Sequence, residues 1–230
     1  MPAALPPAPP ELPAELERSA PALLEDEVVL AEVELADLEL PQQDAKGVAF
    51  SAVRLLRVDL SGSRLEALQI TDASLKGCEL ANLEARGASL WRVSAESCRL
   101  TGIQLTDATL RDVTIAGSRV DLATFAFSKL TRVTFENCNL AQAAFLDSTL
   151  ESVRFHDCDL KTADFRGAKM RACEFRRCEL EGIQGVQYLR GAAMSWVDIV
   201  AAASVFAGAL GIGVIDEESD LEQPDDREHP

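Results

Sequence analysis

The six cysteines have the widest chemistry of any side chains in this sequence, because a thiolate can attack an electrophile, exchange disulfides or bind zinc. Their spacing argues for a structural role instead, since each stands two residues before a multiple of five. The six are Cys78, Cys98, Cys138, Cys158, Cys173 and Cys178. We interpret them as small apolar residues at one buried repeat position, and keep redox or soft-metal chemistry as the alternative.

Other residues that commonly carry catalysis are few. The two histidines, His156 and His229, stand in no spacing typical of a catalytic triad or a metal site. The glycines follow a five-residue spacing and form no phosphate-binding motif. The acidic residues are scattered, with no pocket implied. We therefore expect a protein that is not an enzyme and that has no catalytic residue, cofactor or bound metal.

The cysteine spacing belongs to a five-residue period that covers residues 48–183. Of the 27 multiples of five from Phe50 to Leu180, all except Ala85 and Ala95 are Leu, Ile, Val, Phe or Met. Such a period fits neither a helix nor a strand, so it indicates an internal repeat. Glycine recurs two residues after the large apolar residue, as at Gly87, which is typical of a corner.

These repeats resemble the pentapeptide-repeat family. The two segments closest to the family pattern are Ala163-Asp164-Phe165-Arg166-Gly167 and Cys138-Asn139-Leu140-Ala141-Gln142. The resemblance implies an all-β solenoid, a right-handed quadrilateral β-helix with about twenty residues per coil. Residues 48–183 would then form about seven coils, followed by a C-terminal α-helical cap.

Residues twenty apart should stack in columns on successive coils. Two internal columns are then aromatic: Phe125, Phe145 and Phe165 in one, and Phe135, Phe155 and Phe175 in the other. One external column alternates in charge: Asp72, Arg92, Asp112 and Arg132. We interpret the external column as surface stabilisation by opposite charges; a charged track for a partner is the alternative.

Composition divides the chain into four parts. Residues 1–24 are rich in Pro, Ala and Glu, which predicts a disordered tail. Residues 25–184 form the repeat body, with an irregular first coil to about residue 47 that caps one end. Residues 185–215 are a C-terminal cap or dimerisation segment, and residues 216–230 are an acidic tail that we expect to be disordered.

The C-terminal segment is predicted to be helical. Ser195 and Asp198 have the spacing of a capping box. Apolar residues then recur at helical spacing: Trp196, Ile199, Val200, Ala203, Phe206 and Leu210. We expect this helix to cover the end of the solenoid or to pair with its copy in a homodimer. Because residues 199–215 are uncharged, a membrane-associated segment is the weaker alternative.

Four large apolar residues fall on outward repeat positions and mark a possible interaction surface. They are Trp91, Leu122, Phe127 and Leu146. Phe127 and Leu146 should be neighbours on adjacent coils. An exposed aromatic residue beside an exposed leucine is typical of a contact site for another protein.

The distribution of charged residues along the chain determines how we rank the possible functions. The net charge is −16, but residues 47–190 hold 18 acidic and 19 basic residues, so the acidity belongs to the two ends. The resemblance implies one specific role, since some members of the family mimic DNA and bind gyrase, a topoisomerase, which confers resistance to its inhibitors. A near-neutral body does not suit that role, and the acidic ends disfavour direct binding of nucleic acid. We rank a cytoplasmic protein–protein scaffold of unknown partner first, the DNA-mimicking protein second and a membrane-associated protein third.

Overall fold

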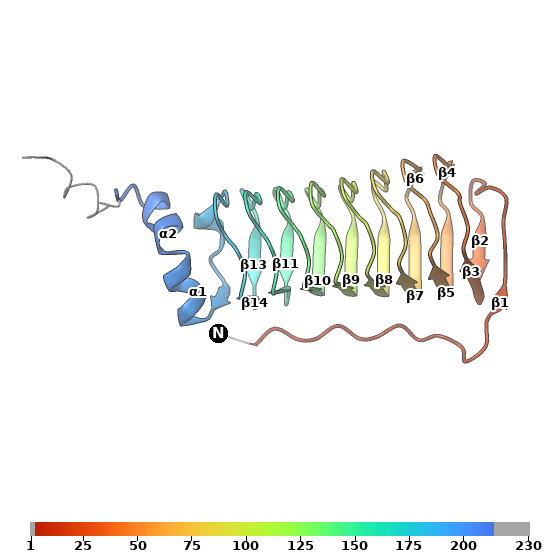
Figure 1. Ribbon diagram of the computed structural model, residues 1–230, viewed down its shortest axis with the longest axis horizontal. Coiled ribbons are helices and arrows are strands. Elements are labelled where there is room, and N and C mark those ends of the chain that lie inside the picture. Colours follow the sequence, from red (N-terminus) through yellow and green to blue (C-terminus); the bar gives the residue numbers. More distant parts are fainter. Residues whose placement is uncertain (1–2, 214–230) are drawn as a thin grey trace, which may run out of the picture.

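The computed structural model describes residues 3–213, which form a parallel β-solenoid with short helices at its C-terminal end (Figure 1). Between residues 29 and 176 successive coils are in register with a shift of twenty residues, as in the pairing of Leu90 with Leu110 and of Leu110 with Leu130. The shift is 16 residues in the first strand pair of the sheet and 19 residues in the last. The predicted β-helix and its repeat register are therefore confirmed.

One ladder of ten strands runs the length of the solenoid. In order it contains β1 (Glu17–Arg18), β3 (Val33–Ala36), β5 (Ala49–Leu56), β7 (Gln69–Lys76), β8 (Ser89–Glu96), β9 (Thr109–Ala116), β10 (Lys129–Glu136), β12 (Arg154–His156), β14 (Cys173–Arg176) and β15 (Ala192–Met194). The remaining strands are β2 (Val29–Ala31), β11 (Thr149–Glu151) and β13 (Lys169–Arg171) in the same sheet, with β4 (Asp44–Lys46) and β6 (Arg64–Glu66) as a separate pair.

The solenoid is longer than the predicted seven coils. The irregular segment before Val48 contributes β1, β2, β3 and β4, although its repeats are imperfect. At the other end, β15 pairs with β14 after the five-residue period has stopped. Backbone pairing with the coil below explains both extensions, because a strand can join an existing ladder without matching side chains.

Corners recur every five residues and have left-handed backbone. On one coil they are Asp72, Gly77, Asn82 and Gly87, with φ between 53° and 70°. Each corner N–H bonds to a carbonyl of the next coil, as from Gly77 to Glu96 at 3.0 Å. The four corners divide each coil into four sides. On each side the large apolar residue of the repeat points into the solenoid.

The interior is aromatic toward the C-terminal end, as the spacing predicts. In one column the rings of Phe125, Phe145 and Phe165 are stacked with centroids 5.0 and 4.8 Å apart. The second column, with Phe155 at its centre, is stacked in the same way at 5.3 and 4.8 Å. Rings of the two columns meet edge to face, which suits the opposite charges of ring face and ring edge.

The N-terminal segment differs from the expected disordered tail. Residues 3–16 run in an extended path along the side of the solenoid toward its C-terminal end, where the carbonyl of Ala4 accepts a hydrogen bond from Arg154 of β12 (Figure 1). β1 then joins the ladder by pairing with β3, and Leu24 is buried in the core. A proline-rich chain is already extended before it docks, so it loses little conformational entropy. We name residues 3–16 the strap.

The C-terminal segment forms η1 (Val186–Tyr188), α1 (Trp196–Ala201) and α2 (Ala203–Ala209). The helix that we expected to run unbroken from Ser195 is divided at Ala202, whose backbone leaves helical geometry. The predicted cap is present, because Ser195 Oγ accepts a hydrogen bond from the Asp198 N–H at 3.2 Å. No helix within residues 3–213 is long and apolar enough to cross a membrane. The acidic segment 216–230 lies outside the described residues.

Candidate interaction surfaces

All six cysteines are free thiols, and five of them are buried on the inner face of the coils. Five of the S–H groups donate to a backbone carbonyl of the preceding coil, as from Cys138 to Ile115 O at 3.3 Å, and that of Cys98 donates to Glu96 O of its own coil at 3.4 Å. Burial raises the pKa of the Cys173 thiol, whereas a hydrogen bond with Cys98 lowers the pKa of the Cys78 thiol to about 7. Burial of both thiols, rather than their pKa, limits their access to a reagent. This environment supports the structural interpretation of the cysteines.

We predict that thiol titration without reductant finds six thiols per denatured chain, and that the native protein reacts at least ten times more slowly. Burial of Cys78, Cys98, Cys138, Cys158 and Cys173 is the reason for the slow reaction. Cys178 lies nearer the end of the solenoid and is partly exposed, so it should react first. Four or fewer thiols in the denatured chain, with an internal crosslink found by mass spectrometry, would contradict this.

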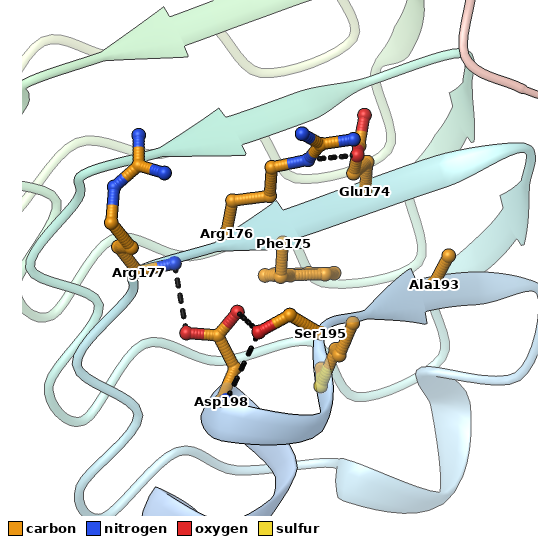
Figure 2. A pocket seen from close by; sticks show the side chains of 8 residues that line it. Glu174, Phe175, Arg176, Arg177, Ala193, Ser195 and Asp198 are labelled. Atoms are coloured by element: carbon orange, nitrogen blue, oxygen red, sulfur yellow. Dashed lines mark hydrogen bonds and ion pairs between the residues drawn. The ribbon is translucent and has the colours of Figure 1, made fainter.

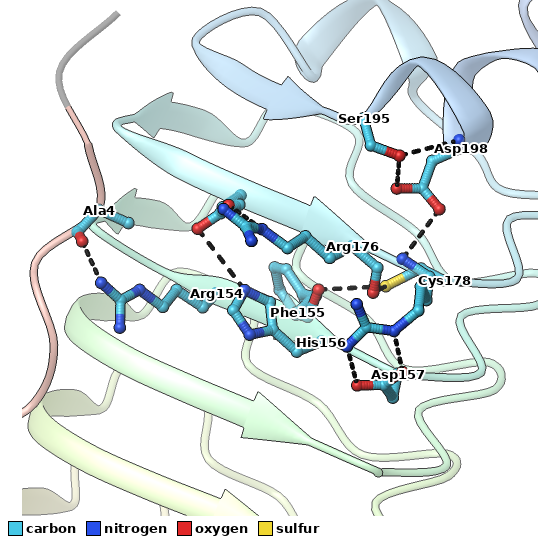
Figure 3. A network of polar contacts seen from close by, with 11 residues as sticks. Ala4, Arg154, Phe155, His156, Asp157, Arg176, Cys178, Ser195 and Asp198 are labelled. Atoms are coloured by element: carbon cyan, nitrogen blue, oxygen red, sulfur yellow. Dashed lines mark hydrogen bonds and ion pairs between the residues drawn. The ribbon is translucent and has the colours of Figure 1, made fainter.

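His156 lies within a polar network on the outer face of β12 (Figure 3). Its Nε2 atom is 3.5 Å from a carboxylate oxygen of Glu174, which also pairs with Arg176. Within residues 3–213 no three His, Cys, Asp or Glu side chains come together in a way that could hold a metal ion. The network joins one coil to the next.

The charged column of Asp72, Arg92, Asp112 and Arg132 is formed as expected, in two bidentate pairs. Arg92 donates to both carboxylate oxygens of Asp72 at 2.5 Å, and Arg132 donates to those of Asp112 at 2.6 and 2.5 Å. The arginine hydrogen bonds lower the pKa of both carboxyl groups. Each pair therefore stabilises the fold above the ordinary pKa of Asp, and this contribution is lost as the pH falls through the lowered pKa.

The strap covers this column, which the sequence analysis did not anticipate. The backbone N–H of Ala8 donates to Asp112 Oδ1 at 3.1 Å, and that of Glu11 donates to Asp72 Oδ1 at 2.8 Å. Both aspartates are buried in consequence. The sequence feature that could have predicted this contact is the regular placement of the non-proline residues within residues 5–11.

The predicted outward apolar residues do not form one patch. Phe127 is 61% exposed, and its N–H donates to the carbonyl of Leu146 at 2.8 Å, so these two residues are neighbours as expected. Leu122 is 54% exposed at the preceding corner of the same coil. Trp91 lies in β8 on another coil, with the Arg92 guanidinium 3.8 Å from the centre of its ring. We name Leu122, Phe127 and Leu146 the apolar corner.

The two C-terminal helices pack on the last coil through fewer residues than predicted. Asp198 accepts a hydrogen bond from the Arg177 N–H at 2.8 Å, and Asp198 and Phe175 line the same pocket (Figure 2). Of the predicted apolar residues, Phe206 is half-buried against the core, whereas Ile199, Ala203 and Leu210 are exposed. Trp196 and Val200 are 76% and 57% exposed.

A hollow of about 490 Å³ separates α1 from the outer part of β14. Glu174, Arg176 and Ser195 lie on its rim, and Phe175 forms its floor (Figure 2). Glu174 and Arg176 are already paired with each other, and Ser195 donates to the carboxylate of Asp198 at 2.6 Å. The polar link between α1 and the last coil is the bond from the Arg177 N–H to Asp198.

Two family models match the chain. The model described as pentapeptide repeat region matches residues 120–184, and the model described as pentapeptide repeats (8 copies) matches residues 71–112. The chain is a pentapeptide-repeat protein. No curated protein matches its sequence significantly.

Several solved structures of pentapeptide-repeat proteins are similar in fold. A trypsin-treated form of QnrB1, a plasmid-mediated fluoroquinolone resistance protein, has 20% identity over 86% of this chain and 99% of that one, with a TM-score of 0.46. HetL from Nostoc sp. strain PCC 7120, a protein involved in heterocyst differentiation regulation, has 20% identity over 74% and 90%, with a TM-score of 0.30. Rfr23 from the cyanobacterium Cyanothece 51142 has 17% identity over 51% and 88%, with a TM-score of 0.35. At these identities and scores, none of the three indicates a function for this chain.

We predict that this pentapeptide-repeat protein aggregates when residues 185–230 are deleted. The deletion removes β15, so β14 becomes an unpaired edge that can pair with another chain. Size-exclusion chromatography with light scattering measures the effect, and deletion of residues 214–230 alone is the control. An equally monodisperse product from both deletions would show that the last coil needs no cover.

Proposed function

We propose that this pentapeptide-repeat protein is a non-catalytic scaffold that binds another protein through the apolar corner. The observation that supports the proposal is the exposure of Phe127 and Leu122. Both lie at corners of the coil, where a large apolar side chain lies outside the core. Neither side chain belongs to the buried core, and both project from a rigid ladder. A partner that covers Phe127 removes apolar surface from water, at about 1.5–3 kcal/mol for a side chain of this size.

The backbone at these corners strengthens the argument. Phe127 and Leu122 have φ of 59° and 60°, where an ordinary L-residue costs about 1–2 kcal/mol relative to right-handed backbone. Between residues 42 and 182 the equivalent corners on other coils hold Gly, Ala or Asp in the column of Phe127, and Gly, Asn, Gln or Thr in that of Leu122, so neither column has another large apolar residue. A large apolar residue there contributes nothing to folding, which favours a role in binding.

The DNA-mimicking role remains the alternative, and the charge distribution disfavours it. Acidic side chains of the body pair with basic ones on neighbouring coils, as in Arg64 with Glu84 at 3.0 Å and Arg177 with Asp157 at 2.5 Å. A mimic must offer a dense line of negative charge to the Lys and Arg residues of its partner. Ion pairs of this kind neutralise the negative charge along the surface of the solenoid.

The apolar corner is tested by comparative capture from the cytoplasm of the native host. The bait is wild-type protein or Phe127→Gly, which keeps the left-handed backbone and removes the ring. Asp147→Gly, at the same corner one coil later, is the matched control. We expect a stoichiometric protein partner with wild type and Asp147→Gly, and at least a tenfold lower yield with Phe127→Gly. Equal capture by all three, or a partner retained only through residues 185–230, would contradict the proposed surface.

We also propose that a second copy of the chain pairs through the outward face of α1. The inward face of the helical segment already contacts the last coil through Asp198 and Ala202, while Trp196 and Val200 are left in solvent. Burying these two side chains on a twofold axis would remove their apolar surface from water. Sedimentation equilibrium should show a dimer for wild type and a monomer for Trp196→Lys/Val200→Lys at unchanged melting temperature. A monomeric wild-type protein at 100 μM (roughly a hundred times the Kd of a micromolar dimer) would contradict this pairing.

A further inference from the structure

The strap contains a tripeptide repeat that the scaffold function does not use. Residues 5–13 read Leu5-Pro6-Pro7, Ala8-Pro9-Pro10 and Glu11-Leu12-Pro13. Proline has no backbone N–H, so between residues 6 and 11 only Ala8 and Glu11 can donate from the backbone. Both of these donors bind the charged column, one to Asp112 and one to Asp72.

The spacing of the strap matches the spacing of the coils. A polyproline II helix rises about 3.1 Å per residue, so three residues span about 9.3 Å. Asp72 and Asp112 are two coils apart, which at about 4.8 Å per coil is about 9.6 Å. A polyproline II chain that runs along the rod therefore brings one N–H to each second coil, where the column places a carboxylate.

Burial along the strap has the same threefold period. Ala4 is buried, and Pro7, Pro10, Pro13 and Leu16 are half-buried, whereas Leu5, Ala8, Glu11 and Ala14 are exposed. Leu12 is half-buried as well and departs from this period. One edge of the polyproline II helix thus lies against the solenoid from residue 4 to residue 16.

The two arginines of the column and one beyond it complete the contact. Arg92 and Arg132 hold the carboxylates in place through both oxygens, and each carboxylate still accepts the strap N–H. Arg154 donates to the carbonyl of Ala4 at the far end (Figure 3). Hydrogen bonds to charged groups are stronger than those between neutral groups, so three such contacts can hold a short segment.

We propose that the charged column is a binding site for polyproline II peptides of the x-Pro-Pro type, and that the strap occupies it as a tethered ligand. The site recognises an N–H at every third residue through Asp72 and Asp112, and an extended proline edge through the surface beside them. An x-Pro-Pro segment of another protein must displace the strap to bind. The site lies apart from the apolar corner and stands independently of the scaffold function.

The test uses a fluorescein-labelled peptide of residues 3–14 and fluorescence anisotropy. The protein is the full chain or the chain without residues 1–16, which keeps β1 and the whole ladder. A tethered segment acts at an effective concentration of the order of millimolar. We expect saturable binding to the truncated chain, and at least tenfold weaker binding to the full chain. Binding of equal strength to both chains, or no binding to a folded truncated chain, would overturn the proposal.

Two sets of variants, one in the peptide and one in the protein, test which groups the site recognises. A peptide with Ala8→Pro and Glu11→Pro keeps the polyproline II conformation and loses both donors. On the protein, the truncated Asp72→Asn/Asp112→Asn variant tests the acceptors, and Glu84→Gln, a half-buried acid that pairs with Arg64 elsewhere on the body, is its control. We expect at least tenfold weaker binding for the doubly substituted peptide and for the double protein variant, and no change for Glu84→Gln. Undiminished binding of the doubly substituted peptide would overturn the role of the N–H groups.

A second measurement uses the full chain and does not depend on the truncated one. Amide exchange of Ala8 and Glu11, followed by NMR, should be at least tenfold slower than in the free peptide. Asp72→Asn/Asp112→Asn should remove this protection while the amides of Leu110 and Leu130 stay protected. Exchange of Ala8 and Glu11 at the peptide rate in the wild-type chain would show that the strap does not occupy the column in solution.

Discussion

Leu110→Asp should abolish cooperative folding, with a loss of more than about 5 kcal/mol in the free energy of unfolding. Leu110 is 0% exposed and lies between Leu90 and Leu130 on adjacent coils. Removing a buried leucine costs about 2–5 kcal/mol by itself. An unpaired carboxylate in the same place adds a desolvation cost of several kcal/mol, or takes up a proton. Chemical denaturation followed by circular dichroism measures the loss.

Thr109→Asp is the matched control, because Thr109 precedes Leu110 in β9 and is exposed. It pairs with Lys129 on the next coil, so a carboxylate there meets a positive charge. The expected change is within about 0.5 kcal/mol, as for most surface substitutions. If Thr109→Asp and Leu110→Asp destabilise the chain equally, the repeat register is wrong.

Phe155→Ala should cost about 3–5 kcal/mol, the usual range for removing a buried phenylalanine. The ring of Phe155 is stacked between Phe135 and Phe175, and it meets Phe145 and Phe165 edge to face at 5.6 and 5.9 Å. One truncation therefore opens a cavity that touches four other rings. The melting temperature and the denaturation midpoint should both fall.

The same substitution at Phe127 provides the comparison, because Phe127 is exposed and lies outside the core. Phe127→Ala should change the free energy of unfolding by no more than about 0.5 kcal/mol. A cost at Phe127 similar to that at Phe155 would mean that the apolar corner is part of the fold. It would then lose its support as a binding surface.

The interior of this protein could be predicted from the sequence because one rule governs it. Every coil repeats the same backbone, so a residue such as Phe155 or Cys138 has its environment fixed by its place in the five-residue period. The pairing of Arg92 with Asp72 follows from the same rule, because residues twenty apart in the sequence stack on adjacent coils. Stacked parallel strands leave little freedom in register once one face is buried.

The ends and the surface could not be predicted in the same way. The composition of residues 1–24 indicates disorder, and it hides the threefold placement of the Ala8 and Glu11 amides that fits the coil spacing. The helical pattern after Ser195 gives no sign of the break at Ala202, a buried residue whose small apolar side chain also suits a helix. Apolar periodicity also overstated the contact face of this segment, because Trp196 and Val200 lie in solvent.

The apolar corner shows what a repeat sequence can reveal about function. Between residues 47 and 167 the other corners in the column of Phe127 are Gly, Ala or Asp, so its large apolar side chain is visible against its own column. The partner that covers Phe127 is not encoded in that column. Binding experiments on the intact chain are needed to find it.

A supercoiling assay with purified gyrase separates the scaffold from the DNA mimic most directly. The paired charges of the rod predict no inhibition below about 10 μM, either by the full chain or by a chain without residues 1–24 and 216–230, because acids bound to Arg on neighbouring coils cannot replace phosphates. Weak, salt-sensitive inhibition that disappears with the acidic ends would agree with this account. Sub-micromolar inhibition by the chain without those ends, or its rescue of gyrase from a quinolone-type poison, would contradict it and make the topoisomerase role the function of this protein.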